Sequence, residues 1–167
     1  MSSLGRWEND KTMAKIIIVD DEMSIRLTIS AFLQNAGHDI DCIENAPEAE
    51  TILGSKSYDV AILDIIIGQG SGIDLARKIK KKNRNTQILF TTERPDVQSA
   101  QEAIRLGAFD YIAKPVTKEQ ITTVTMRAVE EKFRRDDYDK LQSEKLQQQA
   151  KLEQTVLQRT AAGAWHR

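Results

Sequence analysis

Short apolar runs recur along the first two thirds of the chain, and longer mixed stretches separate them. The runs lie at residues 15–20, 39–43, 59–64, 87–91 and 109–113. The first, third and fourth are almost continuously apolar, as expected of central strands that are covered on both faces. Alternation of such strands with segments of helical length predicts an α/β fold with a five-stranded parallel sheet, doubly wound by helices.

The segments between the predicted strands carry helix signals. Apolar positions at helical spacing over residues 23–35 are followed by Gly37, a residue that commonly ends a helix. Residues with short polar side chains stand where the next helices should begin. The candidate first residues or caps are Asn45 with Pro47 just inside, Ser71-Gly72 before a helix from Ile73 to about Lys82, and Pro95-Asp96 before a helix that ends at Gly107.

The fifth predicted helix is much longer than the others. Residues 117–120 (Thr-Lys-Glu-Gln) fit a capping box, and the chain then has neither glycine nor proline to about Thr160. Its apolar positions form a broken heptad pattern. We therefore predict that the helix extends beyond the folded domain and that residues 131–167 form a linker or signalling helix with weak coiled-coil potential. A solvated tail that frays after about Asp136 is the alternative.

Composition limits the organisation of the chain. Its 167 residues are 40% hydrophobic and 29% charged, with a net charge of −1. This fits one folded domain, expected over residues 14–130, and gives no basic field to attract nucleic acid. Residues 1–13 read as a disordered leader or a vector remnant. The first apolar run is too short for a signal peptide or a membrane span, so we expect a cytoplasmic protein with no membrane contact.

Polar groups follow four of the predicted strands at their carboxyl ends. Asp20 and Asp21 end the first strand, Asp64 the third, Thr91 the fourth and Lys114 the fifth. Ligand sites of parallel sheets lie at this edge, so these groups should meet there. Crowded carboxylates need a compensating cation, and Mg²⁺ prefers oxygen ligands. One carboxylate could then attack phosphorus, with an ammonium and a hydroxyl to stabilise the phosphoryl oxygens.

The motifs in their order resemble the receiver domain of bacterial two-component response regulators. They are Val19-Asp20-Asp21-Glu22, Leu63-Asp64, Ser71-Gly72, Thr91 and the stretch Gly107-Ala108-Phe109-Asp110-Tyr111-Ile112-Ala113-Lys114-Pro115. The resemblance covers about residues 14–130. It implies a flavodoxin-like receiver fold and a signalling domain that is not an enzyme in the usual sense. Such a domain takes a phosphoryl group from a sensor histidine kinase or a phosphotransfer protein.

The resemblance also implies a metal site. Asp64 matches the phosphoacceptor, which is itself a ligand of Mg²⁺ or Mn²⁺. Asp21 matches a direct metal ligand, and Asp20 matches one that acts largely through water. Ile66 matches the residue whose backbone carbonyl binds the ion, so its apolar side chain need not matter there.

The remaining roles concern the phosphate and the switch. Lys114 and Thr91 match the phosphate-binding residues, and Thr91 with Tyr111 matches the pair that moves upon phosphorylation. Thr92 and Glu93 match positions that modulate access to the acceptor. Thr92 replaces the usual small residue, so we expect it to restrict access. A further departure is Gly68, which replaces the usual proline and predicts a more mobile loop.

The polar tail bears on output and partners. Residues 152–161 are similar to linker helices that precede cyclic-di-GMP phosphodiesterase modules of the HD-GYP class or histidine kinase modules. Residues 117–167 are too few and too uniform for a DNA-binding domain, so direct nucleic-acid contact is not expected. A homodimer through the tail and the face made by the fourth helix, fifth strand and fifth helix is expected instead. An Asp-nucleophile phosphatase and a degenerate receiver serving as a docking scaffold are the alternatives.

Overall fold

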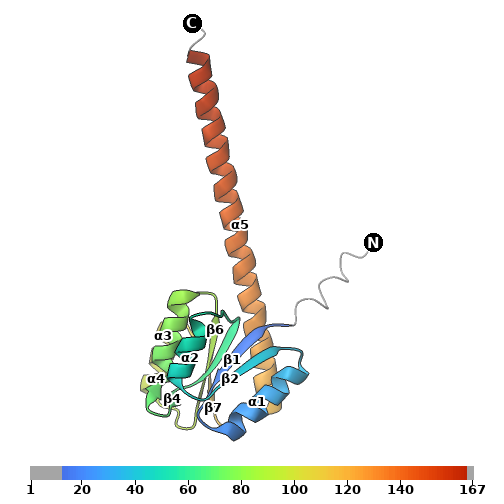
Figure 1. Ribbon diagram of the computed structural model, residues 1–167, viewed down its shortest axis with the longest axis vertical. Coiled ribbons are helices and arrows are strands. Elements are labelled where there is room, and N and C mark those ends of the chain that lie inside the picture. The colour runs from blue at the N-terminus through green and yellow to red at the C-terminus, as the bar shows by residue number, and fades with distance from the viewer. Residues whose placement is uncertain (1–12, 165–167) are drawn as a thin grey trace, which may run out of the picture. The chain divides into compact units, whose positions relative to one another are not determined.

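The computed structural model describes residues 13–164 and contains one five-stranded parallel sheet (Figure 1). The strands of the sheet are β1 (Lys15–Val19), β2 (Asp39–Ile43), β3 (Val60–Asp64), β6 (Gln87–Thr92) and β7 (Asp110–Ala113). Their order across the sheet is β2-β1-β3-β6-β7. This confirms the predicted fold class. The predicted leader, residues 1–13, lies outside the described residues except for Met13.

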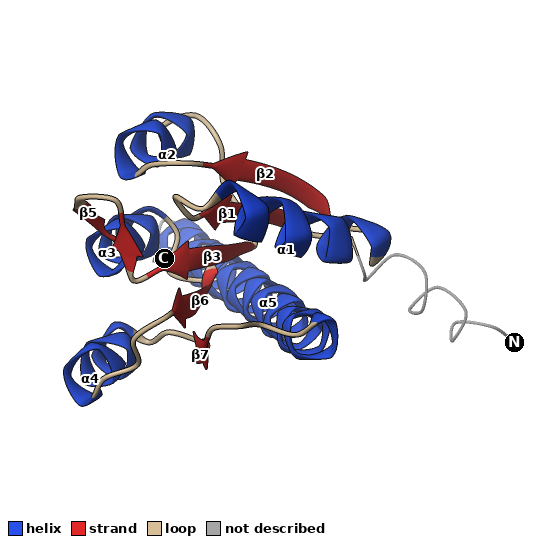
Figure 2. Ribbon diagram, turned by 90° about the horizontal axis from the view of Figure 1, so that it is seen from below, coloured by secondary structure: helices blue, strands red, loops and turns tan. Residues whose placement is uncertain are grey.

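Over residues 13–164, five helices connect or follow the strands. They are α1 (Met23–Asn35), α2 (Ala46–Leu53), α3 (Gly72–Lys82), α4 (Val97–Leu106) and α5 (Lys118–Ala164). Within the compact unit, α2, α3 and α4 cover one face of the sheet, and α1 and the start of α5 cover the other (Figure 2). Among the described residues, no helix combines the length and the apolar character needed to cross a membrane.

The sheet is buried on both faces because its strands alternate their side chains between two apolar layers. Ile17 and Val19 of β1 pack in a cluster with residues of α2, α3 and α4. Ile16 and Ile18 point to the opposite face and are equally buried. The start of α5 supplies Ile121 as a fully buried side chain. Two-sided burial explains why the central strands read as unbroken apolar runs.

Side-chain caps confirm four of the five predicted helix starts, whereas α1 begins without one. Asn45 accepts the N–H of Glu48 at 2.8 Å, and Ser71 accepts the N–H of Asp74 at 3.3 Å. The other two caps are Asp96, which accepts from Ser99 at 2.8 Å, and Thr117, which accepts from Gln120 at 3.1 Å. Each cap satisfies a backbone donor that the first helical turn leaves unpaired.

A small hairpin after β3 was missed by the sequence reading. Strands β4 (Ile66–Ile67) and β5 (Gly70–Ser71) pair antiparallel. Gly68 sits in the turn with a φ of +58°, a conformation that favours glycine. Ile67 is buried beneath the hairpin. The loop after Asp64 is thus a paired hairpin, and proline could not adopt the backbone conformation of Gly68. The greater mobility expected of this loop stays a prediction.

Helix α5 belongs to two units, with the division after Lys132. The first unit includes its buried start, where the Nζ atom of Lys132 lies 3.4 Å from a carboxylate oxygen of Asp59. The second unit starts at Phe133, and its side chains are mostly exposed. The helix continues to Ala164, so the alternative of fraying after Asp136 is wrong.

Candidate functional site

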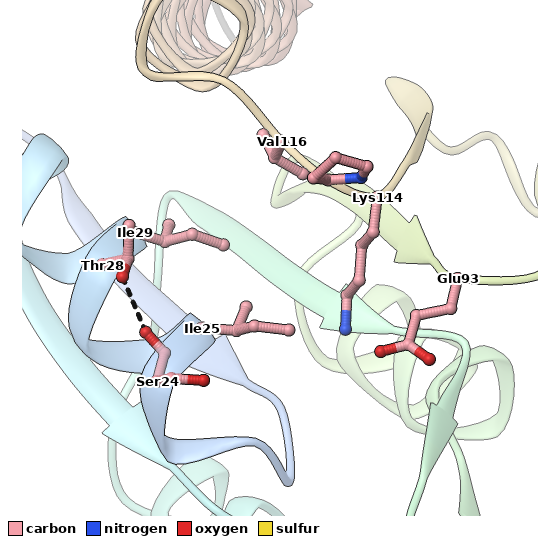
Figure 3. A pocket seen from close by; sticks show the side chains of 8 residues that line it. Ser24, Ile25, Thr28, Ile29, Glu93, Lys114 and Val116 are labelled. Carbon is pink, nitrogen blue, oxygen red and sulfur yellow. Dashed lines mark hydrogen bonds between the residues drawn. The ribbon is translucent and has the colours of Figure 1, made fainter.

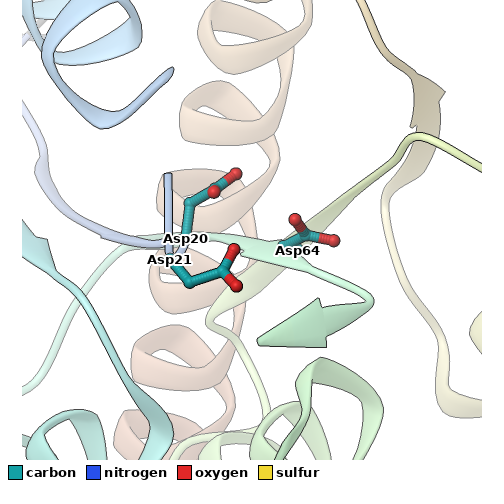
Figure 4. Close-up of side chains that lie close together, drawn as sticks. All are labelled: Asp20, Asp21 and Asp64. Carbon is teal, nitrogen blue, oxygen red and sulfur yellow. The ribbon is translucent and has the colours of Figure 1, made fainter. Parts of the chain in front are cut away.

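Three carboxylates meet where β1 and β3 end (Figure 4). Asp20 and Asp21 follow β1 directly, and Asp64 is the last residue of β3. One oxygen from each carboxylate lies within 4.8 Å of the others. Asp20 and Asp64 are buried, whereas Asp21 is exposed. Parallel pairing of β1 with β3 brings the two strand ends to the same edge, as the sequence predicted.

Backbone groups hold each carboxylate in place. Asp64 accepts the N–H of Ile66 at 3.1 Å, and Asp20 accepts the N–H of Glu22 at 2.9 Å. Asp21 accepts the N–H of Gly68 at 3.2 Å, so the hairpin turn contacts the acid cluster. Proline at position 68 would lack that donor. The departure at Gly68 therefore adds a contact to the site.

Lys114 supplies the positive charge of the site. Its Nζ atom lies 2.8 Å from a carboxylate oxygen of Asp20 and 2.8 Å from one of Asp64. The side chain of Lys114 is only 6% exposed, so the two charge-assisted hydrogen bonds are shielded from water. Lys114 follows β7 at the same sheet edge, and its backbone N–H donates to the carbonyl of Thr92 at 2.8 Å.

The pKa values reflect burial and this pairing. Burial raises the pKa of Asp64 above its ordinary value, although hydrogen bonds from Lys114 and Ile66 oppose the rise. Burial tends to lower the pKa of Lys114, but its bonds to Asp20 and Asp64 outweigh that effect and raise it. Lys114 therefore stays charged at neutral pH. At the rim of the site, a hydrogen bond with Glu93 raises the pKa of Glu22.

The cluster has the chemistry of a divalent-cation site. The cluster holds three carboxyl groups against the single ammonium of Lys114, so acidic groups outnumber basic ones. All three candidate ligands are hard oxygen donors, which Mg²⁺ prefers, and Asp21 is open to solvent for the waters that Mg²⁺ retains. The residues therefore fit Mg²⁺.

Residues 16–126 match the family of the response regulator receiver domain. The chain belongs to this family. Receiver domains are phosphoacceptor signalling modules that pair with histidine kinases, and are not enzymes in the ordinary sense. The chain is similar to the NtrX-like putative response regulator of Rickettsia felis. The two are 35% identical over 128 residues, which cover 74% of this chain and 27% of that protein.

Solved receiver structures agree with the fold. The BeF3-activated DrrB receiver domain is 28% identical with a TM-score of 0.64, over 71% of this chain and 98% of that one. NtrX from Brucella abortus is 27% identical with a TM-score of 0.72, over 78% of this chain and 30% of that one. The chain spans about a quarter of the length of several curated relatives that it matches.

The receiver places Thr91 beside Asp64. The two residues are register partners on the adjacent strands β6 and β3, and the carbonyl of Thr91 accepts the N–H of Ile65 at 3.0 Å. Thr91 is 1% exposed. Thr92 is also buried, and its hydroxyl accepts the N–H of Arg94 at 3.1 Å, whereas Glu93 is exposed.

Tyr111 of the receiver closes a ring of hydrogen bonds with the start of α4. Its hydroxyl lies 2.8 Å from that of Ser99, and it accepts the N–H of Asp96 at 3.3 Å. The hydroxyl of Ser99 donates to the carboxylate of Asp96 at 2.9 Å. The consistent assignment has Tyr111 donating to Ser99. These bonds join β7 to the N-cap of α4, a link that the sequence reading did not identify.

A groove opens beside Lys114 of the receiver, with a volume of about 470 Å³ (Figure 3). Apolar side chains of Ile25 and Ile29 from α1 form one side, and Lys114 and Glu93 stand on the other. The remaining lining residues are Ser24, Thr28, Pro115 and Val116.

Two supporting residues gave little sequence signal. Arg26 on α1 donates from Nη1 to the backbone carbonyl of Asp20 at 2.6 Å, which fixes the strand end that carries the acid pair. Gly72 lies against β3, where an added Cβ would come 1.8 Å from the carbonyl oxygen of Asp64. The Ser71-Gly72 motif predicted a helix start at that position, but not the close approach of Gly72 to the backbone of Asp64.

Proposed function

We propose that this receiver accepts a phosphoryl group on Asp64, in a Mg²⁺-dependent reaction, from a phosphohistidine of a sensor kinase or phosphotransfer protein in the cytoplasm. The observation that carries the proposal is the placement of the Asp64 carboxylate beside Lys114 and within reach of two further acids. A lone strand-end aspartate would serve as a helix cap. Here the carboxylate instead faces a buried ammonium at the ligand-binding edge of the sheet.

The proposed transfer is a displacement at phosphorus. A carboxylate oxygen of Asp64 forms the new P–O bond, the P–N bond to the donor imidazole breaks, and its electron pair stays on the imidazole nitrogen. Lys114 lies where it can pair with the phosphoryl oxygens. After transfer, the hydroxyl of Thr91 is proposed to move toward the phosphoryl group and donate a hydrogen bond to it. When bound by Asp20, Asp21, Asp64 and the carbonyl of Ile66, Mg²⁺ would neutralise the developing charge.

The donor must bring its histidine to Asp64. We place it along α1, because the groove there shares Lys114 with the acid site and offers apolar Ile25 and Ile29. A donor helix with an apolar face could occupy that groove with its histidine at the end nearest Asp64. Exposed Glu93, and Thr92 beside it, would then set how closely the donor approaches.

Incubation with acetyl phosphate tests the phosphoacceptor directly. The wild-type chain with Mg²⁺ should gain the mass of one phosphoryl group, and it should gain none when EDTA removes the metal. Asp64→Asn should remain unmodified, whereas the exposed control Asp110→Asn should behave as wild type. An unmodified wild-type chain would favour a docking scaffold, and modification of Asp64→Asn would refute the assignment.

We also propose that Thr91 and Tyr111 transmit the phosphoryl charge to α4. The hydrogen-bonded ring of Tyr111, Ser99 and Asp96 holds the side chain of Tyr111 in the unphosphorylated arrangement. If Thr91 moves toward the phosphate, Tyr111 can leave the ring and alter the face made by α4, β7 and α5. That face and the tail are the proposed protein-binding or dimer surface.

Ser99→Ala is expected to favour the activated arrangement. The change removes the bonds of Ser99 to Tyr111 and to Asp96, but only the bond to Tyr111 is specific to the resting form. Its loss costs that form about 1 kcal/mol, which corresponds to about a fivefold shift. Beryllofluoride, a phosphoryl mimic, should then bind about fivefold more tightly in calorimetric titrations with Mg²⁺. The exposed control Ser55→Ala should leave that affinity unchanged. Equal or weaker binding by Ser99→Ala would argue against a latch at this ring.

A further inference from the structure

The second unit exposes large apolar side chains along a single helix. In the described part of this unit, six such residues are between 49% and 69% exposed: Tyr138, Leu141, Leu146, Leu152, Val156 and Leu157. An isolated helix is only marginally stable in water, and helical stability in proteins comes mainly from packing of an apolar face. A partner that covers these side chains would therefore stabilise the helix.

The exposed residues fall on one side of the helix when a heptad repeat is applied. With Tyr138 and Leu152 at d positions, Val156 falls at a, Leu141 at g and Leu146 at e. Five of the six apolar residues thus occupy the a, d, e and g positions that face a partner helix. Leu157 falls at b, on the outer side.

We propose that residues 134–156 pair with the same segment of a second copy as a parallel, in-register coiled coil. The flanking positions support this occupant, because each g residue would meet an e residue of matching polarity five positions later on the other copy, and one of these pairs has opposite charges. Basic Arg134 would face acidic Asp139. The next two pairs are apolar Leu141 with Leu146 and polar Gln148 with Glu153. This pairing specifies the dimer surface named in the proposed function. It rests on the proposed function only in taking α5 as the element that carries the output.

The core of this coiled coil is partly polar, so the pairing should be weak. Arg135, Gln142 and Gln149 fall at a positions and Lys145 at d, so four of the seven core positions are polar or charged. Such residues reduce stability but favour one register and one number of strands. The aliphatic stem of Lys145 can pack on the seam while its ammonium reaches water. A weak helical pair suits a linker whose association is adjustable.

Two leucines provide a matched test. Leu152 and Leu157 are 66% and 69% exposed in the single chain, but only Leu152 lies on the proposed seam. Sedimentation equilibrium of the full chain, at concentrations up to about 1 mM, should show a monomer–dimer equilibrium. Leu152→Lys should raise the dissociation constant at least ~100-fold, and Leu157→Lys less than ~3-fold. A monomeric wild-type chain, or equal effects of the two changes, would overturn the proposal.

Cysteine crosslinking tests the direction and register. Cys42 is the only native cysteine, so Cys42→Ser provides a background for single replacements. Val156→Cys should form a disulfide between copies under mild oxidation, because equivalent a positions face each other in a parallel pair. Leu157→Cys should crosslink far more slowly. An antiparallel or shifted pair would leave Val156→Cys uncrosslinked and overturn the register.

The dimer test is independent of the phosphoryl chemistry. Both experiments use no phosphodonor, and they should give the same results in an Asp64→Asn background. Loss of phosphorylation without loss of pairing would refute the phosphoacceptor alone. Normal phosphorylation of a chain that never pairs would refute the coiled coil alone.

Discussion

Lys114→Met should slow phosphorylation of Asp64 by at least ~100-fold while tightening Mg²⁺ binding about tenfold. The ammonium of Lys114 lies 2.8 Å from carboxylate oxygens of both Asp20 and Asp64. It therefore competes electrostatically with a metal ion for the same two acids. It is also the buried cation placed to pair with the transferring phosphoryl group. One substitution should thus move metal affinity and reaction rate in opposite directions.

The measurements are calorimetric Mg²⁺ titration and the rate of phosphorylation by acetyl phosphate. Lys78→Met is the matched control, because Lys78 pairs with Glu50 at the surface, where its side chain is 60% exposed. Both properties should be unchanged in that variant. If Lys114→Met weakened Mg²⁺ binding, or left the rate intact, the proposed role of the ammonium would be wrong.

Gly72→Ala is expected to destabilise the receiver by about 3 kcal/mol. A Cβ at this position would lie 1.8 Å from the carbonyl oxygen and 2.9 Å from the carbonyl carbon of Asp64. Both atoms belong to the backbone, so the end of β3 must move to relieve the overlap. Since that strand end carries the phosphoacceptor, Mg²⁺ affinity should fall together with stability.

Urea unfolding measures the stability change, and Gly163→Ala is the control. An added Cβ at Gly163 would have no atom within 4 Å, and alanine suits a helix better than glycine. That variant should lose no stability. Wild-type stability and metal affinity in Gly72→Ala would show that the close approach at β3 is not required.

The sheet and the edge that carries the site were predictable because their causes are local. Two-sided burial makes an unbroken apolar run such as 87–91 recognisable as a strand. Asn45 and Asp96 indicate helix starts because their side-chain oxygens cap the first turn. Once strands alternate with helices, Asp20 and Asp64 must reach the same sheet edge.

What the sequence did not reveal depends on contacts between distant backbone groups. The N–H of Gly68 reaches Asp21 across 47 positions, and no pattern of side chains encodes that bond. The hairpin at Ile66–Ser71 is too short to show an apolar period. The ring that joins Tyr111 to Ser99 depends on how α4 packs beside β7, which emerges only from the assembled fold.

The most direct test of the central claim is to trap the phosphorylated residue chemically. Borohydride reduces an aspartyl phosphate to homoserine, which tandem mass spectrometry can locate within the chain. After incubation with acetyl phosphate and Mg²⁺, homoserine should appear at position 64 and at no other aspartate, and EDTA should abolish it. Homoserine at Asp20 or Asp21, or none at position 64 in a chain that has gained phosphate, would contradict the assignment of Asp64 as the phosphoacceptor.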